Sequence, residues 1–285
     1  MWIYLNDGFV PSEQAVVSVF DHGFLYGDGV YETLRAYGGR IFMLAQHLAR
    51  LQRSARLIGL ELPIPEKDWP PLLDEAIQRN RLADAYLRIT VSRGEGDIGL
   101  DPALCRRPTV VILALPFKPY PAQLFQEGVR LAIVPVRRNL ATALSPQIKS
   151  LNFLNNILAK REAAMVGAFD GLMLNVEGHL TECTASNLFF VQTGRLCTRS
   201  VDCGILDGIT REVVMQLARE QGLPVEEGRY APKTLQQAEE CFLTNTTMEI
   251  MPVREVDGKP IGSGRPGPMT LTLRTHFQSN LARFL

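Results

Sequence analysis

The sequence predicts an α+β protein of two domains. Its 285 residues amount to roughly twice the ~150 residues of a typical domain. Apolar residues alternate, or run continuously, in short stretches that predict strands, and they recur every three or four residues in stretches that predict helices. Three prolines fall within residues 116–121, where neither a helix nor a central strand continues easily. We therefore predict an N-terminal domain at 1–116, a linker at 117–123 and a larger domain at 124–285.

In the first domain, strands are expected at residues 2–5, 9–10, 16–19, 86–91 and 109–113. An Asn-Asp-Gly turn separates the first two. Leu44, Leu48, Leu51, Ala55 and Ile58 share one helical face, and a second helix is expected after Pro71. In the second domain, strands are expected at 129–136, 171–176, 188–191 and 241–244, and helices at 152–166, 210–221 and 269–284.

Composition excludes several classes of protein. The 30 basic and 30 acidic residues balance, so no net charge attracts nucleic acid or an acidic membrane. No apolar stretch approaches the ~20 residues of a membrane helix. The five cysteines are scattered without zinc-binding spacing, which favours a reducing compartment, the cytoplasm. With 46% hydrophobic residues, a globular protein that binds a small molecule is expected.

Lys149 is one of only six lysines and stands in an apolar setting just before a predicted helix. Partial burial would lower the pKa of Lys149 and so favour its neutral amine, which is the form that condenses with a carbonyl compound to a Schiff base. A lysine that merely caps the helix or reaches to solvent fits the same pattern.

Two polar segments are candidate anion sites. Residues 204–211 lead from glycines into a helix, so the backbone N–H groups and the Thr210 hydroxyl are available to a phosphate. The turn at 244–247 offers further hydroxyl donors, and Arg50 offers positive charge. Each feature alone is also common where only water binds.

Together, these segments resemble the class IV (fold type IV) pyridoxal-phosphate aminotransferases. The matching blocks stand in the family's order, at 21–35, 47–51, 148–152, 180–189, 204–211 and 244–252. The resemblance implies a small N-terminal α/β domain, a larger C-terminal domain with a β-barrel-like core, and a homodimer. It also implies the cofactor pyridoxal 5'-phosphate.

The resemblance also implies residue roles. Lys149 matches the lysine that forms the Schiff base and moves the substrate's proton. Glu182 matches the carboxylate that pairs with the pyridine nitrogen. The phosphate contacts match Arg50, Ile209, Thr210 and Thr246, the ring contact matches Leu206, and a cofactor hydroxyl contact matches Tyr31.

The substrate end of the site distinguishes the branches of the family. Tyr86-Leu87-Arg88 resembles the Tyr-x-Arg of branched-chain enzymes, and the Arg-x-His of D-amino-acid enzymes is replaced here by Ile98-Gly99-Leu100. Where the archaeal-type branched-chain enzymes read Phe-Glu-Gly, this chain has Tyr31-Glu32-Thr33, and it has Phe153 where they place a tyrosine. The predicted substrate contacts are Tyr31, Thr33, Tyr86, Arg88, Thr246 and Thr247.

The resulting prediction is a ping-pong transamination between a branched-chain L-amino acid and 2-oxoglutarate. Three alternatives stay open: aminodeoxychorismate lyase, which would eliminate pyruvate with the same lysine, D-amino-acid aminotransferase, and a pyridoxal-phosphate-binding protein without turnover. No metal, nucleic acid or membrane partner is expected.

Overall fold

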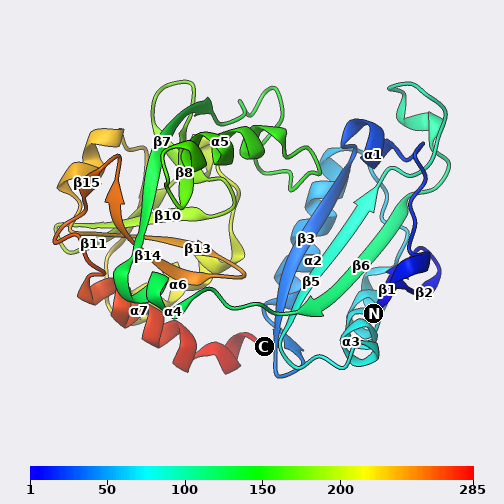
Figure 1. The fold of residues 1–285 in the computed structure, drawn as a ribbon, viewed down its shortest axis with the longest axis horizontal. Coiled ribbons are helices and arrows are strands. Elements are labelled where there is room, and N and C mark those ends of the chain that lie inside the picture. Colours follow the sequence, from blue (N-terminus) through cyan, green and yellow to red (C-terminus); the bar gives the residue numbers. More distant parts are fainter. The chain divides into compact units, whose positions relative to one another are not determined.

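The computed structural model describes residues 1–285 and divides them into two compact units (Figure 1). Unit 1 comprises Met1–Lys118, Ile148–Phe153 and Phe284–Leu285, and unit 2 comprises Pro119–Gln147 and Leu154–Arg283. The main chain first passes from unit 1 to unit 2 within the predicted 117–123 segment. The short piece that carries Lys149 groups with unit 1, whereas the sequence placed it in the domain at 124–285.

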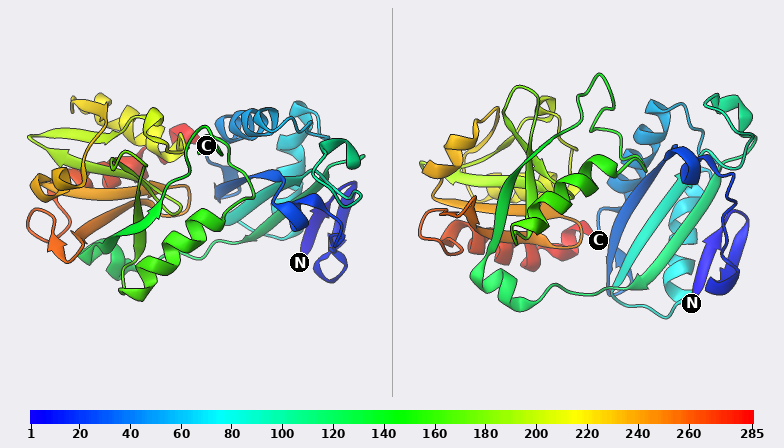
Figure 2. Two further views of the ribbon diagram at one scale, coloured as in Figure 1. Left: turned by 90° about the horizontal axis from the view of Figure 1, so that it is seen from above. Right: turned by 45° about the horizontal axis from the view of Figure 1, so that its top comes forward.

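Unit 1 contains an antiparallel sheet of six strands in the order β2-β1-β6-β5-β3-β4. Its strands are β1 (Trp2–Leu5), β2 (Gly8–Pro11), β3 (Gly29–Tyr37), β4 (Arg40–Ile41), β5 (Ala85–Ser92) and β6 (Thr109–Pro116). Its helices are α1 (His22–Tyr26), α2 (Leu44–Leu57) and α3 (Trp69–Arg79). Figure 2 shows α2 and α3 covering one face of this sheet.

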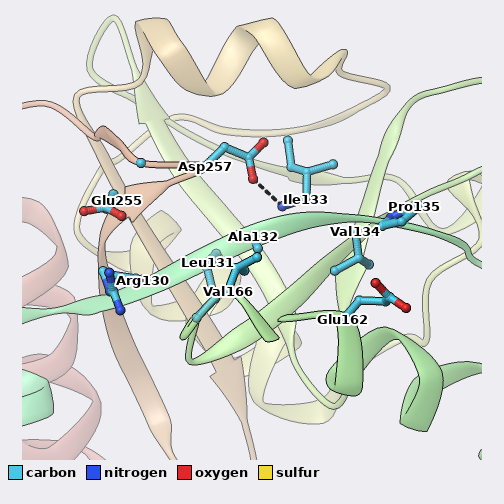
Figure 3. A pocket seen from close by; sticks show the side chains of 12 residues that line it. Arg130, Leu131, Ala132, Ile133, Val134, Pro135, Glu162, Val166, Glu255 and Asp257 are labelled. Atoms are coloured by element: carbon cyan, nitrogen blue, oxygen red, sulfur yellow. Dashed lines mark hydrogen bonds between the residues drawn. The ribbon is translucent and has the colours of Figure 1, made fainter. Parts of the chain in front are cut away.

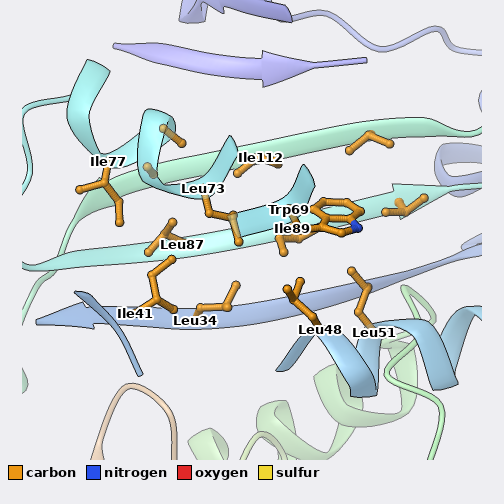
Figure 4. Close-up of a cluster of buried hydrophobic side chains, with 14 of the residues drawn as sticks. Leu34, Ile41, Leu48, Leu51, Trp69, Leu73, Ile77, Leu87, Ile89 and Ile112 are labelled. Atoms are coloured by element: carbon orange, nitrogen blue, oxygen red, sulfur yellow. The ribbon is translucent and has the colours of Figure 1, made fainter. Parts of the chain in front are cut away.

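The core of unit 1 lies between that face and the two long helices. Leu48 and Leu51 of α2 and Trp69 and Leu73 of α3 pack with Leu34 of β3 (Figure 4). The helical face predicted for α2 is thereby confirmed, because Leu48 and Leu51 fall on the side that is buried. The second predicted helix is α3, which begins at Trp69 and not after Pro71. Burial of this surface stabilises the unit, and it leaves the opposite face of the sheet free for polar side chains.

Two predictions for the first domain differ from the structure. Residues 16–19 form no strand: a 3-10 turn at Ser12–Gln14 precedes them, and Val16 is 74% exposed. Conversely, β3 was not predicted as a strand. Its buried face carries Glu32 between apolar Val30 and Leu34, so the charge interrupts the apolar alternation on which strand prediction depends.

Unit 2 contains a mixed sheet in the order β12-β11-β10-β13-β14-β7-β8-β9, with β15 paired to β14. Its strands are β7 (Val129–Arg137), β8 (Asp170–Leu174), β9 (Leu180–Cys183), β10 (Asn187–Gln192), β11 (Arg195–Arg199), β12 (Val225–Gly228), β13 (Glu240–Asn245), β14 (Glu249–Val256) and β15 (Lys259–Pro260). Its helices are α4 (Ala122–Glu127), α5 (Leu154–Met165), α6 (Ile209–Glu220) and α7 (Pro268–Ser279).

The sheet of unit 2 curls back on itself. β9 stands at the end of the strand order, yet it also contacts β10 and β11. The curled sheet forms a half-barrel filled by apolar side chains, which confirms the predicted barrel-like core. α5 packs on β7 and β8, while α6 and α7 pack on β13. None of the helices combines the length and the apolar character that a bilayer crossing requires.

Candidate active site

Lys149 lies on a short extended segment that pairs with β3. Ser150 forms an antiparallel bridge with Val30, the Tyr31 N–H donates to the Lys149 carbonyl at 2.9 Å, and the Leu151 N–H donates to the Gly29 carbonyl at 2.9 Å. A side chain at position 29 would prevent this pairing, because its Cβ would lie 2.6 Å from the Val91 carbonyl oxygen and 2.7 Å from the Leu151 side chain. The glycine at the start of β3 therefore lets the lysine segment join the sheet.

The pairing places Lys149 beside Tyr31. In an antiparallel ladder, residues opposite one another project their side chains to the same face of the sheet. The Lys149 Nζ donates to the Tyr31 hydroxyl at 3.2 Å and stands 4.4 Å from the ring centroid. The Arg88 guanidinium lies 4.0 Å from the same centroid, and the Phe153 ring packs edge-on at 5.5 Å. Tyr31 is therefore in contact with two cations.

The predicted substrate residues of unit 1 share this face. Thr33 of β3 is opposite Arg88 of β5, and Tyr86 lies two residues before Arg88. Thr33, Tyr86 and Arg88 are half-buried and Tyr31 is buried, whereas the alternate residues of both strands point into the core. The Arg88 Nε donates to the Thr90 hydroxyl at 3.2 Å, which orients the guanidinium across the face. Unit 1 thus brings four predicted substrate residues together around Lys149.

Arg50 is held on the other side of β3, by Glu32. Its Nε and Nη2 donate to the two carboxylate oxygens of Glu32 at 2.7 and 2.8 Å, and His47 Nδ1 stands 2.8 Å from Glu32. All three side chains are buried. Burial raises the pKa of Glu32, but the Arg50 charge and the hydrogen bonds from Arg50 and His47 outweigh it and hold that pKa far below its usual range.

This cluster contains two residues that the sequence analysis did not select, Glu32 and His47. His47 is one helical turn before Arg50 on α2, so both reach the same carboxylate. Burial lowers the pKa of His47 despite the neighbouring Glu32, and the charges of Arg50 and Lys149 act in the same direction as burial. The sequence signal for the cluster is a charged residue between the apolar Val30 and Leu34, and the sequence analysis assigned no role to it.

Glu182 of unit 2 is a buried carboxylate with several donors. The Arg138 Nε and Nη2 stand 3.0 and 2.9 Å from its Oε1, and the Leu206 N–H and the Asn187 amide donate to its Oε2 at 3.0 and 3.2 Å. A buried negative charge requires such donors to offset the loss of water. Leu206, predicted to contact a cofactor ring, is thus adjacent to Glu182. Neither Arg138 nor Asn187 was assigned a role from the sequence. Asn187 lies within the matching block 180–189, whereas Arg138 lies outside every matching block.

The start of α6 has open hydrogen-bond donors. No side chain caps the helix at Gly208, so its first backbone N–H groups, those of Ile209 and Thr210, are without a capping partner. The Thr210 hydroxyl is buried and also has no partner. Gly208 is required at this position because a Cβ there would overlap the Asn187 side-chain oxygen. Free N–H groups and a hydroxyl at a helix start fit an anion such as a phosphate.

Thr246 and Thr247 lie in the turn between β13 and β14. The Asn245 side-chain oxygen accepts from the Thr247 N–H at 2.9 Å and from the Met248 N–H at 2.8 Å, which fixes the turn. Thr244, at the end of β13, has a buried hydroxyl without a partner. The turn is therefore held by the Asn245 side chain, and it carries the hydroxyl groups that the sequence predicted.

A separate pocket of about 410 Å³ lies on unit 2, along β7 (Figure 3). Glu162, Glu255 and Asp257 line it together with apolar residues, and Asp257 accepts a hydrogen bond from the Ile133 N–H at 2.7 Å. None of the predicted site residues belongs to its lining. The pocket is therefore distinct from the groups described above.

Comparison with known proteins assigns the family. The profile described as amino-transferase class IV matches residues 29–256, about four fifths of the chain. The chain therefore belongs to the class IV aminotransferases, which confirms the resemblance seen in the sequence. Members of this family are pyridoxal-phosphate enzymes, and the predicted cofactor is confirmed with it.

Several relatives are similar over almost their whole length. A Methanocaldococcus jannaschii protein provisionally named branched-chain-amino-acid aminotransferase is 43% identical, over 98% of this chain and 96% of its own. The D-alanine aminotransferase of Bacillus licheniformis is 36% identical (99% and 97%), and the aminodeoxychorismate lyase of Bacillus subtilis is 33% identical (99% and 96%). Relatives of this chain thus carry the names of three different activities.

Solved structures extend the agreement to the fold. The branched-chain amino acid aminotransferase of Escherichia coli superposes with a TM-score of 0.94 at 31% identity, over 98% of this chain and 93% of that one. That of Thermoproteus uzoniensis, solved with norvaline, superposes with a TM-score of 0.92 at 34% identity, over 99% and 94% of the two chains. The predicted fold type IV architecture is thereby confirmed. The chain is a class IV aminotransferase similar to the branched-chain enzymes.

Proposed function

We propose that this enzyme transfers the amino group of a branched-chain L-amino acid to 2-oxoglutarate. The observation that carries the proposal is the hydrogen bond between Lys149 Nζ and the Tyr31 hydroxyl, on the sheet face that also holds Arg88. A lysine amine oriented at 3.2 Å by a phenol, beside a cationic substrate face, is the arrangement that transamination of a carboxylate substrate requires.

Lys149 supplies the amine that links the cofactor to the protein. When bound, pyridoxal phosphate withdraws electrons from the substrate's α-carbon and so makes its proton removable. Once released from the link, Lys149 Nζ accepts that proton and returns it at a neighbouring carbon. The Tyr31 hydroxyl holds the amine in place during both steps, and the same residues act in reverse on the second substrate.

Glu182 is proposed to face the ring nitrogen of the cofactor. Its Oε1 is already held by Arg138 and its Oε2 by the Leu206 N–H, so the carboxylate needs no rearrangement to receive a cation. Leu206 is proposed to pack against the ring. A negative charge at this position favours the protonated ring nitrogen, which strengthens electron withdrawal.

The phosphate is proposed to bind at the start of α6. The N–H groups of Ile209 and Thr210 and the orphaned Thr210 hydroxyl supply the donors. Thr246 is proposed as a further contact from the turn between β13 and β14. Arg50 contributes positive charge, and Glu32 fixes its orientation.

The substrate is proposed to bind on the half-buried face of the unit 1 sheet. Tyr86 and Arg88 are proposed to receive carboxylate groups, and Thr33 narrows the pocket opposite Arg88. A guanidinium here favours a substrate with a second carboxylate, which supports 2-oxoglutarate as the acceptor. Thr246 and Thr247 are the remaining proposed substrate contacts.

Borohydride treatment followed by peptide mass mapping tests the central assignment. The reagent reduces the link between cofactor and lysine, so the peptide that contains Lys149 should carry the cofactor mass. K149A should show neither the label nor turnover, because no other amine replaces Nζ. A label on another lysine, or unchanged turnover in K149A, would refute the proposal.

Two related activities have specific support. Tyr31, in place of the phenylalanine of branched-chain enzymes, favours D-amino-acid transamination, and the similarity to a lyase supports pyruvate elimination. Incubation of the enzyme with L- and D-amino acids, monitored by the absorbance of the bound cofactor, tests the first alternative. A change in absorbance with D-amino acids would support it. Pyruvate release from aminodeoxychorismate without a keto-acid acceptor identifies the second.

We also propose that the protein is a homodimer. Two segments of unit 1 expose apolar side chains and are joined by hydrogen bonds such as that from the Gly96 N–H to the Phe20 carbonyl. Burial of this surface would stabilise a dimer. Light scattering of the purified protein should give twice the chain mass, and a monomer would contradict the proposal. The exposed residues are Val16, Val17, Val19, Phe20, Phe24, Ile98 and Leu100.

A cytoplasmic location remains part of the proposal. All five cysteines are free, and four of them are buried. Free thiols persist in a reducing compartment. Fractionation of cells that express the protein should recover it with the cytoplasmic enzymes.

A further inference from the structure

The backbone N–H of Lys149 has an unexpected partner. In a continuing antiparallel ladder, residues 31 and 149 would exchange two hydrogen bonds. The first is present, from the Tyr31 N–H to the Lys149 carbonyl. The second would run from the Lys149 N–H to the Tyr31 carbonyl, but this N–H donates instead to the Ser54 Oγ at 3.1 Å. The Ser54 hydroxyl therefore replaces the Tyr31 carbonyl of β3 as the hydrogen-bond acceptor of the Lys149 N–H.

Ser54 reaches the lysine from α2. It stands four residues after Arg50, so the two share the helix face that approaches β3. The Ser54 side chain is fully buried. A serine inside a helix usually bonds to solvent or to its own helix, so a buried hydroxyl that accepts from a distant backbone group is a specific contact.

We infer that Ser54 is a positioning residue for Lys149. Its hydroxyl ends the pairing with β3 at residue 149 and so fixes the point from which the lysine side chain extends toward Tyr31. The inference rests on the proposed role of Lys149 as the cofactor-linked base. The lysine side chain is long and flexible, and a fixed backbone origin reduces the number of positions its amine can occupy.

The substitution S54A removes the acceptor and keeps the helix. In the apoprotein, hydrogen exchange of the peptide 148–153 should accelerate about tenfold, because the Lys149 amide loses its partner. In the holoenzyme, kcat should fall about ten- to hundredfold with little change in KM, because displacement of a reacting group affects the chemical step rather than substrate binding. S54T, which keeps the hydroxyl, should restore both readouts.

S92A is the matched control. Ser92 is also buried in unit 1, and its hydroxyl donates to Asp21 at 2.9 Å and not to the segment that carries Lys149. Its loss should lower stability without an effect on exchange at 148–153 or on kcat. If S54A does not fold, S54C keeps the volume with a much weaker acceptor and answers the same question.

Two results would overturn the inference. One is unchanged exchange at 148–153 in S54A, and the other is a kcat that falls equally in S54A and S92A. Failure of the proposed function has a different signature, since borohydride would then label no cofactor at Lys149 in the unmodified protein. The exchange measurement needs no cofactor, so it tests the placement of Lys149 in either case.

Discussion

The buried ion cluster of unit 1 and the start of α6 in unit 2 differ in how their polar groups are satisfied. Arg50 meets both oxygens of Glu32, and His47 adds a third contact through Nδ1, so the charges of the cluster are paired within the protein and only the buried His47 Nε2 has no partner. At α6, the Thr210 hydroxyl and the first N–H groups have no partner. The charges of one region are paired within the protein, whereas the other region offers open donors to the phosphate that we propose.

This difference indicates that Arg50 and Thr210, which the sequence analysis placed in one phosphate site, contribute in different ways. Arg50 and Thr210 were both predicted to hold a phosphate. A guanidinium committed to a buried carboxylate acts first as part of the core, and its loss should affect folding. A buried hydroxyl without a partner lowers the stability of the apoprotein, and it contributes favourable binding energy only when a ligand accepts its hydrogen bond. Substitutions in the two regions should therefore have opposite effects on the apoprotein.

The largest effect is expected for E32Q. This change keeps the shape of the side chain but removes the carboxylate charge that pairs with the buried Arg50, which should lower the free energy of unfolding by about 3–5 kcal/mol. Denaturant unfolding of the apoprotein measures it. E75Q is the control, because the Arg79–Glu75 pair on α3 is half exposed and should contribute less than about 1 kcal/mol. Equal effects of the two substitutions would show that the cluster is not a structural unit.

T210V tests the other side of the comparison. Loss of a hydrogen bond to a charged phosphate should weaken cofactor binding by about 1.5–3 kcal/mol. The apoprotein should be as stable as before or slightly more so, because an unpaired buried hydroxyl has been replaced by a methyl group. Cofactor titration and denaturant unfolding measure the two quantities.

T270V is the matched control for T210V. Thr270 is equally buried in unit 2, but its hydroxyl donates to Glu240 at 2.6 Å. Its replacement should destabilise the apoprotein and leave cofactor affinity unchanged. If T210V behaves like T270V, the hydroxyl at 210 has a partner within the protein, and the start of α6 is no open site.

The sequence marks the candidate site residues more clearly than the contacts that hold them. Lys149, Glu182 and Thr210 stand in motifs of contiguous residues, so their chemical type and neighbours identify them. The groups that position them come from remote segments: Ser54 is 95 residues from Lys149, and Arg138 is 44 residues from Glu182. Serine and arginine are ordinary at such positions, so no local signal marks them.

The fold was predictable from the sequence where buried residues recur at the regular spacing of a helix or a strand. The helix α2 and the strand β5 alternate cleanly between core and surface, and both were predicted. β3 was missed because Glu32 occupies a core position, and its burial is possible only with partners on α2. The same ion cluster that shapes the site therefore also hid the strand that carries Tyr31 and Thr33.

The pH dependence of stability tests the state of His47. Glu32 is ionised and only accepts, so His47 donates from Nδ1 and stays neutral in the buried cluster. Its pKa is lowered in the folded protein from the ordinary 6.5, so the unfolded chain binds more protons below that pH. Stability is therefore expected to fall as the pH drops through about 6.5, by up to about 2 kcal/mol at pH 5.

H47N removes the titrating ring and keeps an amide donor for Glu32. Between about pH 7.5 and pH 5, the free energy of unfolding of H47N should decrease less than that of the unmodified protein. H179N, at a partly exposed surface histidine outside the cluster, is the control for the loss of an imidazole ring. A steep slope retained in H47N would mean that another group titrates and that the cluster does not hold a neutral imidazole.

The smallest effect is expected for R199M. This substitution compares a buried group that has no proposed ligand, Arg199, with one that is proposed to bind the phosphate, Thr210. Arg199 of β11 is fully buried between the rings of Phe190 and Tyr230, at 4.7 and 4.9 Å, and none of its guanidinium nitrogens has an acceptor. Burial lowers its pKa to about 10. Methionine fills similar space without the charge, so the free energy of unfolding should rise by about 1 kcal/mol.

The control for R199M is R211M. Arg211 is also buried in unit 2, but it is bonded to Glu227 and to the Arg199 carbonyl, so its replacement should destabilise the protein. Neither change should alter cofactor affinity by itself, in contrast to T210V. If R199M is instead destabilising to the same degree as R211M, the two aromatic rings compensate the buried charge, and the lack of an acceptor at Arg199 has no energetic cost.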